Sequence, residues 1–169
     1  MNYTVIVAED EELLLNNLVH KIEKADPDFQ VIGTAQTGAQ ALSLVEQMSP
    51  DVVFTDIKMP VMDGIELLKQ VKKESPETVV ILLTAFEEFD LAREALRHGC
   101  DDYLLKTEMN SAYFQEVLTG LVRQVAESGL QIRPGEQEET EGQKRLIIRN
   151  ILQSRSVLSE EDVEQLGRC

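Results

Sequence analysis

Short apolar runs and longer amphipathic segments alternate along the first 127 residues of the chain. Runs rich in Val, Ile, Leu and Phe predict buried strands at 3–8, 30–35, 51–55, 78–85 and 101–105. Segments with apolar residues at helical spacing follow at 11–25, 37–48, from 63 to just before Pro76, at 87–99 and at 110–127. Strict alternation of this kind predicts an α/β fold, a five-stranded parallel sheet with helices on both faces.

Helix boundaries are marked by particular residues. Thr37 with Gln40, and Asp63 with Glu66, have the N-cap and N3 spacing of a capping box, and therefore predict the starts of the second and third helices. Gly99 stands where a left-handed residue would end the fourth helix.

The composition changes at residue 128. Gly, Pro, Glu and Gln dominate 128–141, which predicts a linker. Residues 142–169 contain short amphipathic stretches such as KRLIIRNILQS, which predict helices but are too few to bury a core of their own. The expected organisation is therefore a domain at 1–127, a linker at 128–141 and a helical extension at 142–169.

Composition and charge limit the function classes. The chain is 43% hydrophobic and 28% charged, with a formal net charge of −15 and no clustered basic surface, so we expect no nucleic acid binding through its own surface. Its two cysteines do not form a disulfide framework. No apolar stretch is long enough to span a bilayer, and the N-terminus is not a secretory signal. We therefore expect a cytoplasmic protein without membrane contact.

Polar residues lie at the carboxyl ends of four of the predicted strands. Glu9 and Asp10 follow the first strand, Asp56 the third and Lys106 the fifth, while Thr84 ends the fourth. Ligands of doubly wound sheets sit at the carboxyl ends of the strands, so these side chains are expected to converge.

The expected cluster has a definite chemistry. Carboxylates within ~6 Å of one another repel by roughly 3 kcal/mol per pair at an effective dielectric near 20. Mg²⁺ offsets such repulsion and prefers oxygen ligands. Beside the metal, one carboxylate can attack a phosphoryl group to form an acyl phosphate. The ammonium of Lys106 and the hydroxyl of Thr84 would then contact the phosphoryl oxygens.

Four short motifs together resemble a known family. They are AEDE (8–11), DIKMPVMDG (56–64), LLTA (82–85) and DDYLLK (101–106), in this order and each at a strand end. The set is similar to the receiver domain of two-component response regulators, over residues 1–127. The resemblance implies a flavodoxin-like (CheY-like) fold.

The resemblance also implies a role for individual residues. Asp56 would accept a phosphoryl group from a sensor histidine kinase. Its implied Mg²⁺ ligands are Glu9, Asp10, Asp56 and the backbone carbonyl of Lys58. The protein would then be no conventional enzyme, since it would catalyse only its own Mg²⁺-dependent phosphorylation and dephosphorylation.

Three further residues receive implied roles. Thr84 and Lys106 would contact the phosphoryl group, and Tyr103 would be the aromatic residue that turns inward when Thr84 moves. The implied result is a conformational switch that a phosphoryl group controls.

Two positions depart from the family pattern. Glu9 stands where Asp is commoner, and its longer side chain shifts the metal geometry. Thr107 follows Lys106 where the family usually has Pro after a cis peptide bond. Because a cis bond before a non-proline residue costs roughly 3–4 kcal/mol, we expect either a trans bond with an altered loop or a strained cis bond.

The C-terminal part of the chain resembles particular response regulators. The segments EEFDLAREALRHGCDDYLLK and RLIIRNILQSRSVLSEEDVEQLG are similar to those of regulators that end in an AraC-type DNA-binding module. The resemblance implies that the receiver controls transcription through such a domain, which this chain does not contain. It also implies a homodimer formed through the fourth helix, the fifth strand and the fifth helix.

Two alternative functions stay open. The first is a phosphatase with an aspartyl-phosphate intermediate, but such enzymes carry a second Asp two residues after the nucleophile, where this chain has Lys58. The second is a pseudo-receiver, a binding module that keeps the fold without phosphorylation. The substitution at Thr107 is the feature that keeps this second alternative open.

Overall fold

The computed structural model describes residues 2–85, 89–109 and 112–128. The chain divides into two units, Met1–Arg133 and Pro134–Cys169, and every described residue lies in the first. The linker expected at 128–141 and the helical extension expected at 142–169 lie outside the described residues, except for Ser128.

Strands and helices alternate throughout the described part of the chain. The strands are β1 (Tyr3–Ala8), β2 (Phe29–Ala35), β3 (Val52–Asp56), β4 (Val79–Thr84) and β5 (Asp102–Leu105). The helices are α1 (Glu12–Ala25), α2 (Gly38–Met48), α3 (Gly64–Glu74), α4 (Phe89–Arg97) and α5 (Ala112–Ser128), and a 3-10 turn, η1 (Lys106–Glu108), follows β5. The predicted order and type of these strands and helices are confirmed, and their ends differ from the prediction by about one or two residues.

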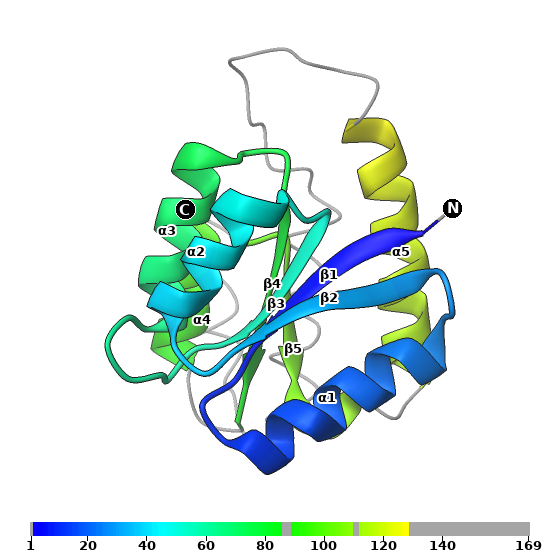
Figure 1. Ribbon diagram of the computed structural model, residues 1–169, viewed down its shortest axis with the longest axis horizontal. Coiled ribbons are helices and arrows are strands. Elements are labelled where there is room, and N and C mark those ends of the chain that lie inside the picture. Colours follow the sequence, from blue (N-terminus) through cyan, green and yellow to red (C-terminus); the bar gives the residue numbers. More distant parts are fainter. Residues whose placement is uncertain (1, 86–88, 110–111, 129–169) are drawn as a thin grey trace, which may run out of the picture. The chain divides into compact units, whose positions relative to one another are not determined.

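The strands form one parallel sheet in the order β2-β1-β3-β4-β5. Helices α1 and α5 cover one face of the sheet, and α2, α3 and α4 cover the other (Figure 1). The predicted five-stranded sheet with helices on both faces is therefore confirmed. The strand order reverses between β1 and β3, and such a reversal is where ligands bind in open α/β sheets.

The core explains why the strands are apolar without alternation. Every second strand residue packs with α1 and α5, and this cluster contains Val5, Val7, Phe54, Ile81, Leu83, Leu104, Leu15, Leu18, Ile22, Phe114 and Leu118. The intervening residues Ile6, Val53 and Leu82 are buried as well. Because successive strand residues point to opposite faces, both faces must be apolar when helices cover both.

The predicted helix signals have the expected geometry. Thr37 Oγ1 accepts a hydrogen bond from the Gln40 N–H at 3.1 Å, and Asp63 Oδ1 accepts one from the Glu66 N–H at 2.8 Å. Gly99 has φ 82°, as expected for a left-handed residue after α4.

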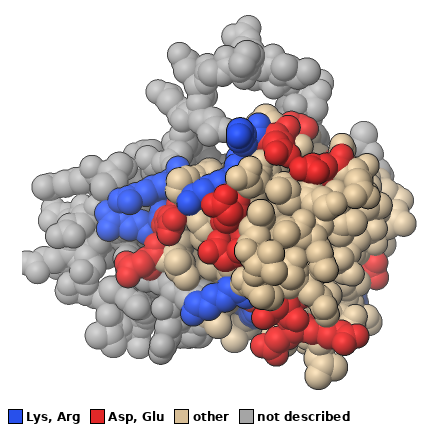
Figure 2. Space-filling view, turned by 60° about the vertical axis from the view of Figure 1, so that its left-hand side comes forward, with Lys and Arg blue, Asp and Glu red and all other residues tan. Residues whose placement is uncertain are grey.

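Charges of both signs are mixed on the described surface. In the view that brings the side of α2, α3 and α4 forward, positive and negative side chains lie next to each other (Figure 2). The exposed pair Lys69 and Glu94, 3.5 Å apart, is an example that contributes less than about 1 kcal/mol. Within residues 2–85, 89–109 and 112–128, no helix is long and apolar enough to cross a membrane.

The loop at 57–63, between β3 and α3, contains a strained turn. The Met62 N–H donates to the Pro60 carbonyl at 2.8 Å, and Val61 between them has φ 70°. This is a three-residue γ-turn with positive φ, which is rare, and it is an outlier for a β-branched residue. Such a residue costs of order 1–3 kcal/mol.

We predict that Val61→Gly stabilises the protein by about 1 kcal/mol. The Val61 side chain is 88% exposed, so its removal loses little packing, while glycine accepts positive φ at an entropic cost of roughly 0.5–1 kcal/mol. Urea unfolding measures the change, with Val61→Ala as the control that keeps a Cβ atom and much of the strain. A Val61→Gly variant less stable than Val61→Ala would contradict the strain assignment.

Candidate functional site

The polar residues at the strand ends do converge. Ala8, the last residue of β1, pairs with Thr55 of β3, so the residues that follow, Glu9 and Asp56, end neighbouring strands at the same level. Asp56 is the last residue of β3, one position beyond the predicted end of that strand. The site therefore lies at the reversal of strand order between β1 and β3.

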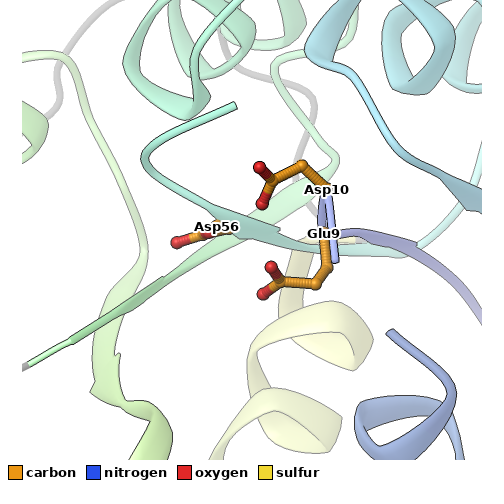
Figure 3. Close-up of side chains that lie close together, drawn as sticks. All are labelled: Glu9, Asp10 and Asp56. Carbon is orange, nitrogen blue, oxygen red and sulfur yellow. The ribbon is translucent and has the colours of Figure 1, made fainter. Parts of the chain in front are cut away.

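Three carboxylates gather at this edge. Figure 3 shows Glu9 and Asp10 at the end of β1 beside Asp56 at the end of β3. Each offers one oxygen, and these three atoms all lie within 4.8 Å of one another. Glu9 and Asp56 are buried, whereas Asp10 is exposed. Oxygen atoms grouped in this way are the donor set that Mg²⁺ prefers.

Lys106 is the positive charge in contact with the two buried carboxylates. Its Nζ lies 2.7 Å from Glu9 Oε2 and 3.1 Å from Asp56 Oδ2. The other oxygen of Asp56, Oδ1, accepts a hydrogen bond from the Ile57 N–H at 2.8 Å. One ammonium group thus serves two carboxylates, and Asp10 adds a third negative charge.

The carboxylate of Glu9 has fewer hydrogen bonds than a buried carboxylate usually makes. Its Oε1 accepts a long bond of 3.4 Å from the Glu11 N–H. Its Oε2 is buried and makes no hydrogen bond, and its ion-pair partner is Lys106 Nζ at 2.7 Å, which it shares with Asp56. A buried carboxylate oxygen without a hydrogen bond is costly in a folded protein, and a bound cation would compensate it.

The pKa values of these groups reflect the burial of charge. Burial raises the pKa of Glu9 to about 6, and the charge of Asp56 adds to this, while the contact with Lys106 opposes it. Burial likewise raises the pKa of Asp56 against the opposing effect of Lys106. Burial alone would lower the pKa of Lys106, but the two carboxylates outweigh it and raise that pKa.

Thr84 and Tyr103 lie on the two neighbouring strands. Thr84 is the last residue of β4, is buried, and its hydroxyl donates to the Ala85 carbonyl at 2.9 Å. Tyr103 of β5 is paired with Leu82 of β4 and is also buried. Thr84 therefore reaches the edge that carries the carboxylates, whereas Tyr103 lies two residues before the end of its strand.

The two other predicted features concern backbone. Lys58 lies in the loop after Asp56, and its side chain is exposed. The bond between Lys106 and Thr107 is trans, since the described residues contain no cis peptide bond. Of the two expected bond geometries, the trans bond is therefore the one observed, and the 3-10 turn η1 begins at Lys106.

Two glycines contact the loop after Asp56. Neither was predicted as a site residue, although Gly64 is the last residue of the motif DIKMPVMDG. A Cβ atom on Gly64 would overlap the carbonyl oxygen of Asp56, and one on Gly38 would overlap that of Met62. The available signal was a glycine directly after each N-cap residue, Thr37 and Asp63.

The sequence matches a described family and several relatives. Residues 5–118 match the family model of the response regulator receiver domain. The uncharacterized transcriptional regulatory protein YesN of Bacillus subtilis (strain 168) is 37% identical over 125 residues, which cover 72% of this chain and 34% of that protein. The transcriptional regulatory protein HptR of Staphylococcus aureus (strain NCTC 8325) is 34% identical over 125 residues, covering 74% of this chain and 48% of HptR. The matched part thus spans less than half of either relative.

Solved structures show the same fold. The REC domain of AraT, a response regulator from Geobacillus stearothermophilus, is 29% identical with a TM-score of 0.66, covering 76% of this chain and 99% of that one. The response regulator domain of Thermotoga maritima CheB is 30% identical with a TM-score of 0.61, covering 79% of this chain and 100% of that one.

The raised pKa of Glu9 predicts a pH-dependent stability in the absence of divalent cations. Since the folded pKa of about 6 exceeds the ordinary value of 4.5, the folded state holds the proton more tightly. The contribution of Glu9 to the free energy of unfolding should then fall by about 2 kcal/mol as the pH rises through this window, and this contribution should stay level above it. Glu9→Gln should lack this loss.

Urea unfolding at pH 4.5 and pH 7.5 with a chelator present measures the difference. Glu9→Gln should gain about 2 kcal/mol relative to the wild type between the two pH values. Glu12→Gln, which removes an exposed carboxylate of α1, is the matched control. An equal pH dependence in the wild type and Glu9→Gln would show that burial does not hold the proton on Glu9.

Proposed function

The chain belongs to the response regulator receiver domain family, and on this premise we propose that Asp56 is its phosphoryl acceptor. Phosphorylation on an aspartate is typical of this family, and its members are phosphorylated by histidine kinases. The observation that supports Asp56 is its convergence with Glu9, Asp10 and Lys106 at the reversal of strand order. Among these acids, Asp56 is the one that ends the central strand β3 and contacts Lys106 through one oxygen while the other is held by backbone.

A magnesium ion fits the acidic cluster. The three carboxylate oxygens within 4.8 Å provide an all-oxygen donor set, and the buried Oε2 of Glu9 lacks a hydrogen bond. Glu9, Asp10, Asp56 and the carbonyl of Lys58 would hold the ion. Bound there, Mg²⁺ would neutralise charge on the carboxylates and on the phosphoryl oxygens.

Transfer of the phosphoryl group from the kinase is a nucleophilic displacement at phosphorus. A carboxylate oxygen of Asp56 attacks the phosphorus of the phosphohistidine, so the O–P bond forms while the P–N bond breaks. The imidazole leaves with the bonding electrons and takes up a proton. Lys106 already lies 3.1 Å from Asp56 Oδ2, where its ammonium can pair with a phosphoryl oxygen. Hydrolysis is a separate step: water attacks the phosphorus of the acyl phosphate, the bond between phosphorus and the Asp56 oxygen breaks, and inorganic phosphate and the free carboxylate are formed. The protein would thus act only on itself.

Thr84 and Tyr103 would convert the modification into a conformational change. The Thr84 hydroxyl, which now donates to the Ala85 carbonyl, would instead donate to a phosphoryl oxygen. The Tyr103 ring, buried on the neighbouring strand β5, would follow this movement. The energetic source is the new charge-assisted hydrogen bond, which is stronger than a bond to a neutral carbonyl.

The signal is proposed to act on transcription. Both relatives described above are transcriptional regulatory proteins, and the matched part spans less than half of each. Together with the resemblance of the C-terminal segments, this supports a longer parent protein with an AraC-type DNA-binding domain. Pairing of two receivers through α4, β5 and α5 is the accompanying proposal for how the signal reaches that domain.

We predict that acetyl phosphate with Mg²⁺ adds one phosphoryl group to the wild type and none to Asp56→Ala. Intact-mass spectrometry measures the adduct directly. Asp90→Asn, which removes an exposed carboxylate of α4, is the matched control and should be labelled like the wild type. A lack of adduct on the wild type and both variants would favour the pseudo-receiver, and equal labelling of all three would place the acceptor elsewhere.

We further predict that Mg²⁺ stabilises the protein by about 2.7 kcal/mol when its concentration is a hundred times the dissociation constant. Glu9→Gln should weaken this effect because it removes a charged ligand. Lys106→Met should strengthen Mg²⁺ binding about tenfold, because it removes a competing positive charge from the same carboxylates. Thermal unfolding at several Mg²⁺ concentrations measures the Mg²⁺ affinity of each variant. If Glu9→Gln and Lys106→Met changed this affinity in the same direction, the carboxylates would not be shared between Lys106 and the ion.

A further inference from the structure

Helix α2 contributes no side chain to the acidic cluster, yet its first residue contacts the loop that follows Asp56. The Gly38 N–H donates to the Met62 carbonyl at 3.0 Å. A Cβ atom on Gly38 would overlap that carbonyl oxygen and lie 2.9 Å from Met62 Cγ. The approach of α2 to the 57–63 loop is therefore a backbone-to-backbone contact that only glycine allows.

A second glycine, Gly64, joins the two ends of the same loop. The Gly64 N–H donates to the Ile57 carbonyl at 2.7 Å, which closes the loop on itself. A Cβ atom on Gly64 would overlap the carbonyl oxygen of Asp56. Gly64 thus holds the base of the loop, and Gly38 holds the segment next to it.

The strained turn at Val61 lies between these contacts. Val61 has φ 70°, and a residue keeps such a strained conformation only where contacts with the surrounding structure hold it there. Val61 itself is exposed and makes little packing. The restraint therefore comes from backbone bonds on either side, and Met62, which closes the turn through its N–H, is held through its carbonyl by Gly38.

We propose that Gly38 is a positioning residue of the phosphoryl-acceptor site, which acts by holding the 57–63 loop in its strained conformation. This inference rests on the proposed function, because the loop carries Lys58, whose carbonyl is the proposed fourth metal ligand. If Gly38 is replaced, the loop must move away from α2, and the Lys58 carbonyl moves relative to the carboxylates. The start of α2 is thereby coupled to the metal affinity of a site that it does not touch with any side chain.

The test is Gly38→Ala, compared with two other glycine-to-alanine variants. A Cβ atom on Gly120 would meet nothing within 4 Å, and one on Gly33 would meet side chains alone, Leu44 at 3.3 Å and Ile6 at 3.7 Å. Labelling by acetyl phosphate is followed as a function of Mg²⁺ concentration. Gly38→Ala should raise the half-saturating Mg²⁺ concentration about tenfold, as loss of an outer-shell positioning contact does. The rate at saturating Mg²⁺ should approach that of the wild type, and the two controls should match the wild type throughout.

The outcomes separate this inference from the proposed function. If the wild type is labelled and Gly38→Ala has the same Mg²⁺ dependence, Gly38 has no positioning role and the acceptor assignment stands. If the rate falls at every Mg²⁺ concentration with an unchanged midpoint, Gly38 is only structural. If the wild type itself is not labelled, the proposed function fails.

Amide hydrogen exchange of the wild type provides the answer even if Gly38→Ala does not fold. Mg²⁺ should slow exchange of the Gly38 N–H. An ion bound by the Lys58 carbonyl would hold the 57–63 loop near its start, and this would keep the Met62 carbonyl, which accepts from the Gly38 N–H, in place near its end. The Ile57 N–H, bonded to Asp56 Oδ1, reports on the site itself. Slower exchange at Ile57 without any change at Gly38 would overturn the coupling.

Discussion

Two buried carboxylates, Glu9 and Asp56, are held side by side with one ammonium group between them, and the rest of the site follows from this constraint. A partly buried ion pair elsewhere in the structure shows the difference. Asp101 Oδ2 accepts from Lys72 Nζ at 2.6 Å and from the Val80 N–H at 2.8 Å, so that pair is well satisfied. Glu9 Oε2, in contrast, has an ion pair and no hydrogen bond. A buried carboxylate oxygen that lacks a hydrogen bond is unfavourable for folding and favourable for binding a cation.

The sheet makes this arrangement unavoidable for the chain. Strands β1 and β3 are neighbours in register, and their apolar residues are buried on both faces, so neither strand can slide to separate its terminal acids without exposing core residues. The apolar cluster with α1 and α5 adds to this restraint, because Val5, Val7 and Phe54 all belong to it. Core packing thus supplies the stability that the charged edge lacks, and it keeps the carboxylates close together.

The residues of the site were predictable because each lies at the end of a strand. The apolar runs indicate where strands end, and one topological rule brings the carboxyl ends of parallel strands together, which is enough to predict the meeting of Glu9, Asp10, Asp56 and Lys106. Less local features were not predictable. One is the register shift between Val5 and Ile6 in the pairing of β1 with β2, which no residue pattern in the sequence marks. The conformation after Lys106 depends on tertiary contacts, and the sequence left both peptide isomers open until the trans bond was observed.

The loop after Asp56 explains why part of a site leaves so little trace in sequence patterns. Side chains with a chemical role are visible as Asp, Glu, Lys or Thr at strand ends, but backbone contacts appear only as the absence of a side chain. Gly64 beside the Asp56 carbonyl and Gly38 beside the Met62 carbonyl are such positions, where the missing side chain makes room for the backbone. A glycine that follows an N-cap residue is readily explained as part of a helix start, so its second role becomes visible only when the opposing backbone is known. Val61 between them carries the strain that these contacts make possible, and its residue type favours a different conformation. Local preference and tertiary structure therefore disagree in this loop, next to the charged edge where the proposed chemistry takes place.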